Sequence, residues 1–309
     1  MREVCFGADI GGTTVKLGLV SREGELLEKQ EFPTRRQLDD AFDDIAGHIR
    51  QIMMCFPDEQ YIGVGVGIPG PVVDQSRVHG CVNLGWGEID VAQELGRRTG
   101  LNVRAANDAN LATLGEQWQG AGKGCRNVVM FTVGTGVGGG IICDGRILAG
   151  ATGGGGEVGH LPLPFRPKWQ CACGKYGCLE VTASASGIIR AAREYSPFKE
   201  MEHVTARDVY DAAAAGDENA KRVVIEAGQA LGMAAAMLAC VVNPEVFLLG
   251  GGVSAAGRAL LDPVEASFQK YVFPPCGKAR FALARLGNNA GIYGGAALFF
   301  TQDGSAEPS

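Results

Sequence analysis

Two segments of this chain repeat one local pattern: a strand, a turn rich in Gly and Thr, and a second strand. The first is VCFGADIGGTTVKLGLV, from Val4 to Val20, and the second is NVVMFTVGTGVGGGIICDGRIL, from Asn127 to Leu148. In the two copies Gly11 matches Gly134, with a register difference of two residues further along. A pattern that opens each half of a chain indicates an internal duplication, and it predicts two related α/β domains.

The length and composition allow such an arrangement. A chain of 309 residues is long enough for two domains, and 46% hydrophobic with 20% charged residues is ordinary for a globular protein. The net charge of −6 and the lack of a Lys/Arg run argue against nucleic-acid or anionic-membrane binding. The N-terminus has no signal peptide and no apolar run of membrane-spanning length, so we expect a cytoplasmic protein with no membrane contact.

Apolar periodicity places the other elements. Helices are predicted over 37–55, from Asn107-Asp108 to Trp118, over 217–242 and over 288–300, the last one returning to the N-terminal domain. Strands are predicted over 61–69, 101–106 and 245–249. Thr205 and Asp208 form a predicted capping box.

The two Gly/Thr turns are candidate phosphate sites, because bare Gly backbone lets N–H groups approach phosphate oxygens. A dinucleotide-binding turn would lead into a helix, whereas both turns here lead into strands, and no GxxxxGK[ST] motif occurs. The remaining alternative is a tight hairpin turn. The presence of two copies of the Gly/Thr turn favours phosphate binding over this alternative. Asp9 precedes the first turn and could hold the Mg²⁺ of a Mg-nucleotide through water, or it could stabilise an Asx-type turn.

Two further motifs lie at strand ends. Asp108 could act as a general base that accepts the proton of a substrate hydroxyl, with Asn107 binding a neighbouring hydroxyl; the alternative is a helix N-cap. Gly250-Gly251-Gly252-Val253-Ser254 could let an adenine and its ribose lie against backbone, or it could be a simple turn.

A Gly-punctuated loop concentrates three of the ten cysteines. Cys171, Cys173 and Cys178, together with His160 upstream, provide three thiolates and one imidazole, which is a closed tetrahedral Zn²⁺ set. A redox dithiol would use C-x-x-C, and an iron–sulfur cluster would need a fourth nearby Cys. The seven scattered cysteines are interpreted as small buried thiols. Glu157, three residues before His160, could join it in binding a polyol.

These motifs together resemble the ROK family (repressor, open reading frame, kinase) of bacterial sugar kinases, from about Cys5 to Phe300. The most specific piece joins EVGH, from Glu157 to His160, to CACGKYGCLE, from Cys171 to Glu180. The resemblance implies two actin-like (ribonuclease H-like) domains of the hexokinase/actin superfamily with a cleft between them. The smaller would span 1–118, completed by a C-terminal helix over 293–309, and the larger, with the zinc loop, would span 119–292.

The resemblance also implies a function, ATP- and Mg²⁺-dependent phosphorylation of a hexose, with glucose 6-phosphate as the expected product, in a homodimer. Asp108 would be the catalytic base and the zinc would be structural, held by His160, Cys171, Cys173 and Cys178. Sugar hydroxyls would be bound by Asn107, Asp108, Glu157, His160 and Glu180. The nucleotide would be bound by Asp9, Gly11, Gly12, Thr13, Thr14, Lys16, Thr135, Gly136, Gly251 and Gly252.

Three alternatives to a glucokinase stay open. The sugar could instead be N-acetylmannosamine, N-acetylglucosamine, fructose or allose. A sugar-sensing repressor of the family would carry a DNA-binding segment before the first turn, for which eight residues leave no room. A non-catalytic sugar-binding member is less expected, because Asp108 is present where the base should be.

Overall fold

The computed structural model describes residues 1–81 and 84–301, which group into two compact units. The first unit comprises Met1–Arg126, Gly140–Gly156 and the segment from Arg285 onward, and the second comprises Asn127–Gly139 and Glu157–Ala284. The domain boundaries expected from the sequence stay a prediction, and residues 302–309 of the expected last helix lie outside the described residues.

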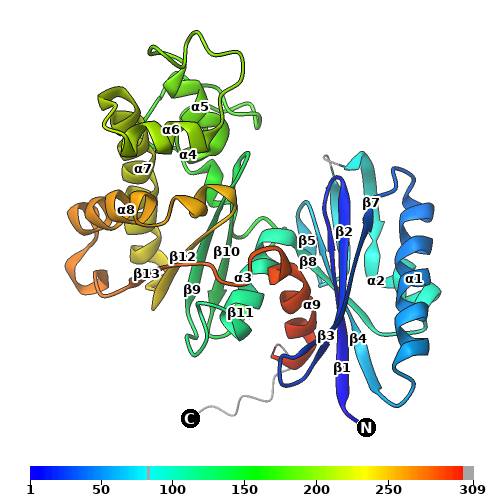
Figure 1. The fold of residues 1–309 in the computed structure, drawn as a ribbon. Coiled ribbons are helices and arrows are strands. Elements are labelled where there is room, and N and C mark those ends of the chain that lie inside the picture. Colours follow the sequence, from blue (N-terminus) through cyan, green and yellow to red (C-terminus); the bar gives the residue numbers. More distant parts are fainter. Residues whose placement is uncertain (82–83, 302–309) are drawn as a thin grey trace. The chain divides into compact units, whose positions relative to one another are not determined.

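The first unit is built on a five-stranded sheet with the strand order β3-β2-β1-β4-β8 (Figure 1). The first three strands form an antiparallel meander, β4 runs parallel to β1, and β8 runs parallel to β4. The strands are β1 (Glu3–Ile10), β2 (Thr14–Ser21), β3 (Leu26–Pro33), β4 (Gln60–Ile68) and β8 (Val103–Asn107). The helices are α1 (Leu38–Cys55), α2 (Val91–Thr99), α3 (Asp108–Gln119) and α9 (Ala290–Phe300).

Strand β1 divides its side chains between two faces, because successive residues of a strand point to opposite sides. Val4, Phe6, Ala8 and Ile10 belong to one hydrophobic core together with the apolar stripe of α1, which supplies Phe42, Ile45, Ile49 and Ile52. The other face, which includes Gly7 and Asp9, lies against α9. The predicted 37–55 helix is therefore confirmed, with its apolar stripe buried as the periodicity requires.

Helix α9 approaches this sheet at backbone distance. A Cβ atom on Gly7 would lie 1.9 Å from the carbonyl oxygen of Ile292, and one on Gly65 would lie 2.0 Å from that of Gly295. The absence of side chains at these positions is what lets the helix reach β1 and β4. The expected return of the last helix to the N-terminal sheet is thus present.

The second sheet has the strand order β11-β10-β9-β12-β13, with the same connectivity as the first. Here β12 runs parallel to β9 and β13 runs parallel to β12, while β10 starts in the second unit and ends in the first. Its strands are β9 (Val128–Val133), β10 (Val137–Cys143), β11 (Arg146–Ile147), β12 (Val246–Gly250) and β13 (Arg280–Leu283). The shared strand order confirms the predicted duplication and the α/β fold class.

Helices make up most of the rest of the second unit. They are α4 (Leu179–Ala183), α5 (Ala185–Ala192), α6 (Ala206–Ala214), α7 (Glu218–Val242) and α8 (Arg258–Tyr271), with short 3₁₀ turns η2 (Val158–His160), η3 (Gly252–Ala256) and η4 (Pro274–Cys276). The predicted capping box of Thr205 and Asp208 begins α6, and the Asp217 side chain caps α7.

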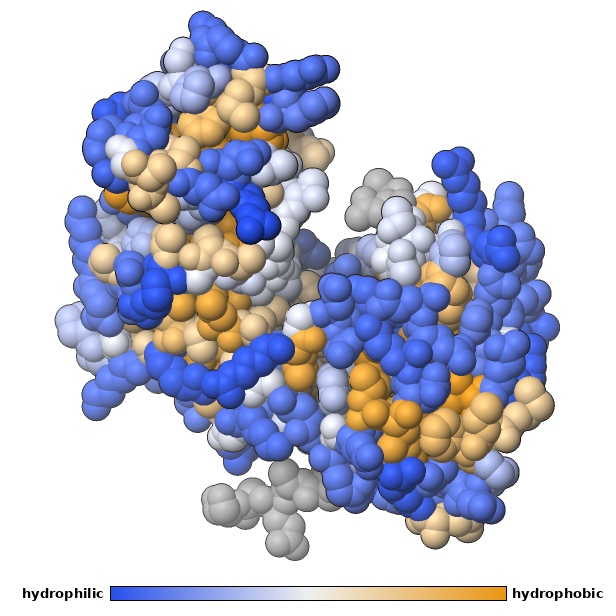
Figure 2. Space-filling model, in the orientation of Figure 1, coloured by the Kyte–Doolittle hydropathy of each residue, from blue (hydrophilic) through white to orange (hydrophobic). Residues whose placement is uncertain are grey.

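Helix α7 contradicts the expectation that no apolar run in the sequence reaches membrane-spanning length. By length and composition it could cross a membrane, so the sequence does contain an apolar run of that length. However, 61% of its most apolar window is buried inside the protein, which is typical of a core helix. The face of the molecule shown in Figure 2 is largely hydrophilic, with apolar residues in separate patches.

The first unit also contains a small antiparallel sheet that the sequence did not predict. Its strands are β5 (Val72–Val73), β6 (Arg77–Cys81) and β7 (Trp86–Asp90). All ten cysteines are free thiols, as expected. The expectation that the seven scattered ones are buried holds for Cys5 and Cys81 but is wrong for Cys55 and Cys240, which are exposed at the ends of helices.

Candidate active site and metal centre

The first Gly/Thr turn connects β1 to β2 and presents bare backbone. The N–H of Gly11 donates to the carbonyl oxygen of Thr14, and the Thr34 hydroxyl donates to the carbonyl oxygen of Gly11 at 2.7 Å. The N–H of Thr34 also donates to the carbonyl oxygen of Thr13. Gly12 is exposed, and a Cβ atom there would meet nothing within 4 Å. The turn is therefore anchored at its base and open at its tip, as a phosphate-binding turn requires.

Asp9 lies at the end of β1, in a space made by glycines. A Cβ atom on Gly291 of α9 would lie 2.8 Å from one Asp9 carboxylate oxygen, and one on Gly67 would lie 3.5 Å from the other. Burial raises the pKa of Asp9 to about 6, opposed by the charge of Lys16 and reinforced by that of Asp108. A half-buried carboxylate with a second carboxylate nearby favours a cation, so its donor chemistry fits a Mg²⁺ site.

Lys16 pairs with Asp9 in the register of β1 and β2. Its Nζ atom donates to Oδ1 of Asn288 at 3.4 Å. The positive charge of Lys16 thus acts on the Asp9 carboxylate, and the lysine lies on the strand that follows the first turn.

The sequence left two roles open for Asp108, general base and helix N-cap. The Oδ1 atom of Asn107 accepts from the N–H groups of Ala109 and Asn110, so Asn107 is the N-cap of α3. Asp108 is the first helical residue, and its Oδ1 atom accepts from the N–H of Ala109 at 2.8 Å. Burial raises the pKa of Asp108, partly offset by hydrogen bonds from Ala109 and Asn107. The N-cap alternative for Asp108 is therefore wrong.

The second Gly/Thr turn connects β9 to β10 and is supported by Glu180. The N–H of Gly134 donates to the carbonyl oxygen of Gly136, which leaves Thr135 exposed at the tip. Oε2 of Glu180 accepts from the N–H of Val137 at 3.1 Å, and a Cβ atom on Gly136 would lie 2.2 Å from it. Glu180 therefore shapes this turn, a contact that the sequence analysis did not anticipate.

A pocket of about 710 Å³ opens beside this turn in the second unit. Gly134 and Thr135 line one side, and η3, which follows β12, lines another. Gly251 has φ = 81°, and a Cβ atom there would lie 2.4 Å from the carbonyl oxygen of Val133, so this position needs glycine. Helix α6 completes the pocket with Ala206, Arg207, Tyr210 and Asp211, which the sequence analysis missed because no motif marks them.

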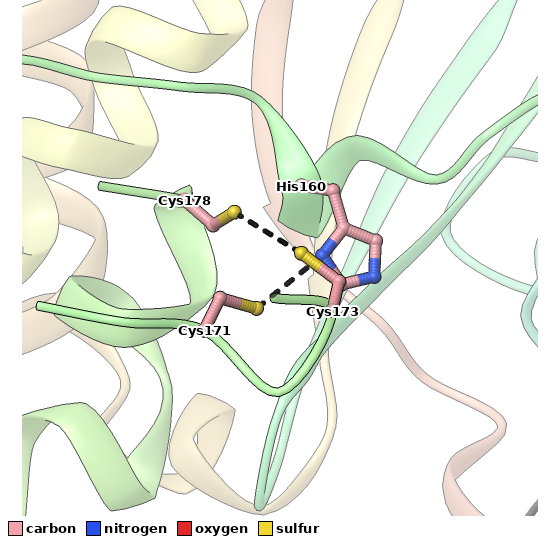
Figure 3. Close-up of side chains that lie close together, drawn as sticks. All are labelled: His160, Cys171, Cys173 and Cys178. Atoms are coloured by element: carbon pink, nitrogen blue, oxygen red, sulfur yellow. Dashed lines mark hydrogen bonds between the residues drawn. The ribbon is translucent and has the colours of Figure 1, made fainter. Parts of the chain in front are cut away.

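The predicted zinc ligands converge on one point (Figure 3). Their ligand atoms all lie within 4.8 Å of one another, with Cys173 Sγ 3.7 Å from Cys178 Sγ and Cys171 Sγ 3.6 Å from His160 Nδ1. Tetrahedral Zn²⁺, with bonds of about 2.3 Å to sulfur and 2.0 Å to nitrogen, predicts separations of about 3.8 and 3.5 Å. The residues therefore fit a zinc ion in both donor chemistry and spacing.

His160 directs its two ring nitrogens to different partners. Nδ1 faces Cys171 within the cluster, while Nε2 lies 3.9 Å from Oε2 of Glu157. Oε1 of Glu180 accepts from the Cys171 thiol at 3.4 Å. The cluster thus brings Glu157, His160 and Glu180 into one neighbourhood of the second unit, as the sequence analysis expected.

Comparison with known proteins gives a consistent result. The family model described as "ROK family" matches residues 5–302. A glucokinase of Halalkalibacterium halodurans is 41% identical, with 97% of this chain and 96% of that protein covered. A ROK hexokinase structure from Thermus thermophilus has a TM-score of 0.83 at 30% identity, with 97% of this chain and 98% of that one covered. A ROK family glucokinase from Streptomyces griseus, solved with glucose and AMPPNP, has a TM-score of 0.76 at 31% identity over 96% of this chain and 99% of that one.

Proposed function

This chain belongs to the ROK family, and we propose that it is an ATP-dependent glucokinase that phosphorylates the 6-hydroxyl of D-glucose. The observation that carries the proposal is the half-buried carboxylate of Asp108, whose pKa is raised by burial while Asn107 serves as the N-cap of α3. The choice of glucose rests on the glucokinase relative that is 41% identical over nearly the whole chain.

Asp108 acts as the general base. Its carboxylate accepts the proton of the sugar hydroxyl as that oxygen attacks the γ-phosphorus, and a raised pKa improves its match to neutral pH. The Asn107 amide donates to the carbonyl oxygen of Gly70 and hydrogen-bonds Asp108, and it binds a sugar hydroxyl beside the base. Glu157, Glu180 and Nε2 of His160 bind the remaining hydroxyls.

The two Gly/Thr turns hold the phosphates of ATP through backbone N–H groups and the hydroxyls of Thr13, Thr14 and Thr135. Asp9 would hold Mg²⁺ through water, and the bound ion would supply positive charge toward the phosphates. The adenosine lies in the pocket beside the second turn, against Gly251 and Gly252. Lys16 contributes positive charge beside Asp9.

The zinc is structural in this proposal. Three thiolates and Nδ1 of His160 would hold the ion as a full set of four ligands, so none of its positions would be left for substrate. The chain would act as a cytoplasmic homodimer; both properties are predictions from the family resemblance.

The test is a coupled assay of ADP release from the purified protein with D-glucose, fructose, allose, N-acetylglucosamine and N-acetylmannosamine. We expect the highest kcat/KM with D-glucose, and the same preparation carrying Asp108→Asn shows whether the activity belongs to this chain. A higher kcat/KM with an N-acetylhexosamine would overturn the choice of sugar, and no ADP release with any sugar would overturn the proposed activity. Polyphosphate in place of ATP tests the phosphoryl donor.

A further inference from the structure

Helix α6 forms a wall of the pocket beside the second turn. Arg207, Tyr210 and Asp211 are spaced three and four residues apart, so they share one side of the helix. All three line the pocket, as does Ala206 at the start of the helix, together with Gly252, Val253, Ala255 and Ala256 of η3. A helix about 70 residues beyond the turn in sequence thus supplies side chains to the same pocket.

Arg207 and Asp211 are the charged side chains among the described residues that line this pocket. The other lining residues are Gly, Ala, Val, Thr135 and Tyr210. The Tyr210 hydroxyl is buried without a hydrogen-bond partner, and burial alone raises the pKa of this phenol. Its ring therefore contributes an apolar wall, while its oxygen is enclosed by protein atoms. Arg207 and Asp211 are therefore the charged groups that this lining offers to a bound molecule.

These two side chains hold each other only loosely. Nε of Arg207 lies 3.8 Å from Oδ2 of Asp211, and the two side chains are 89% and 73% exposed. An ion pair in water at this distance contributes little. Either group can therefore turn toward a ligand at small cost, which suits a pair at the mouth of a binding pocket.

We propose that Asp211 accepts a hydrogen bond from the nucleoside of ATP and that Arg207 stacks its guanidinium on the base. An ionised carboxylate is only an acceptor, so its partner is a donor on the nucleoside: a ribose hydroxyl or the 6-amino group of adenine. A planar guanidinium stacks on aromatic faces, and the small side chains of η3 leave room for a flat base on the opposite side. This inference rests on the proposed function, because it assigns the pocket to ATP.

The experiment compares Asp211→Ala with Asp262→Ala. Asp262 is an exposed residue of α8 that pairs with Arg258 at the same i,i+4 spacing and does not line the pocket, so it is a matched control. Calorimetry measures the dissociation constant of AMPPNP, and the ADP-release assay gives the KM values for ATP and glucose. We expect Asp211→Ala to weaken AMPPNP binding and to raise the KM for ATP about tenfold, with the KM for glucose unchanged. Asp262→Ala should match the wild type.

Nucleotide analogues identify the donor. If Asp211 binds a ribose hydroxyl, the wild type should lose affinity for 2′-deoxy- or 3′-deoxy-ATP, and Asp211→Ala should not distinguish that analogue from ATP. If it binds the 6-amino group, the wild type should lose affinity for purine riboside triphosphate, and Asp211→Ala should not distinguish that analogue from ATP. Arg207→Met should weaken AMPPNP binding but keep the wild-type discrimination among the analogues, because Asp211 is intact, and Tyr210→Phe should bind as the wild type does.

Unchanged AMPPNP affinity in Asp211→Ala, or an equal loss in Asp262→Ala, would overturn the inference. A wild type that fails to bind AMPPNP would overturn both this inference and the nucleotide part of the proposed function. If instead AMPPNP binding depends on Asp211 while no sugar is phosphorylated, the proposed function fails and the assignment of Asp211 stands.

Discussion

The side-chain oxygen of Asn107 caps helix α3 by accepting from the N–H groups of Ala109 and Asn110, while the carboxylate of its neighbour Asp108 accepts from the N–H of Ala109 alone. The two residues are adjacent in sequence, but their side chains have different contacts. Asn107 fixes the start of the helix, and Asp108, at the first helical position, has a half-buried carboxylate whose pKa is raised by burial.

Replacing Asp108 by Asn should therefore remove the proposed base and leave glucose binding largely intact. We expect kcat to fall by roughly 10²- to 10⁴-fold, with the dissociation constant of glucose changed less than about threefold. Because the base must be ionised, wild-type turnover should fall as the pH is lowered through the raised pKa of Asp108. Asp40→Asn, an exposed carboxylate in the first turn of α1, is the control. Lost glucose binding with retained turnover would refute the assignment of the base.

Asp9 should make the protein less stable at neutral pH when nucleotide and metal are absent. Its folded pKa of about 6 lies above the ordinary value of 3.8. Its stabilising contribution is therefore complete below pH 3.8 and is lost as the pH rises through about 6. A shift of about two pKa units corresponds to about 3 kcal/mol.

Asp9→Asn should abolish this pH dependence and disturb ATP use. Denaturant unfolding of both proteins at pH 4 and 7.5 gives the difference in free energy of unfolding, which we expect to change by up to about 3 kcal/mol in favour of the variant at the higher pH. The variant should also show a raised KM for Mg-ATP. An equal difference at both pH values would show that the Asp9 carboxylate does not titrate in this window.

The predicted zinc site should determine both the metal content and the stability of the protein. The wild type should contain about one zinc per chain by elemental analysis, and Cys173→Ser should release it and lower the melting temperature. Cys240→Ser changes an exposed cysteine of α7 and should alter neither. The wild type has all four ligand residues, so a wild type without metal would contradict the zinc assignment.

Glu157→Gln should act on the sugar more than on the nucleotide. Loss of a charge-assisted hydrogen bond should raise the KM for glucose about tenfold or more, with the KM for ATP changed less than about twofold. Glu202→Gln, a nearly fully exposed residue of the same unit, is the comparison. An effect confined to ATP would place Glu157 away from the sugar.

Two glycines of the first unit should respond oppositely to alanine. Gly65→Ala forces a Cβ atom to within 2.0 Å of the Gly295 carbonyl oxygen, and neither backbone can rotate away, so we expect a loss of about 3 kcal/mol or more. Gly47 lies inside α1 with nothing within 4 Å of its Cβ position, so Gly47→Ala should stabilise the protein by up to about 1 kcal/mol. Similar melting temperatures for the two variants would contradict the close packing of α9.

The sequence revealed the parts of the fold and site that local chemistry encodes. The duplicated turns, the Thr205 capping box and the cluster of His160 with three cysteines all depend on residues close together in the chain. The small sheet of β5 to β7 escaped prediction because a two-residue strand has no periodicity to detect. Arg207 and Asp211 escaped because only the fold brings α6 to the second turn, and the contact of Glu180 with Val137 escaped for the same reason.

The close contact between α9 and β1 has a consequence for how this protein is made. The first strand leaves the ribosome early, but the helix that covers its Gly7 and Asp9 face begins only at Ala290. During synthesis that face has no partner, so the N-terminal sheet stays incomplete until almost the whole chain has been translated. The surroundings of Asp9, which include Gly291 of this helix, are therefore completed only at the end of synthesis.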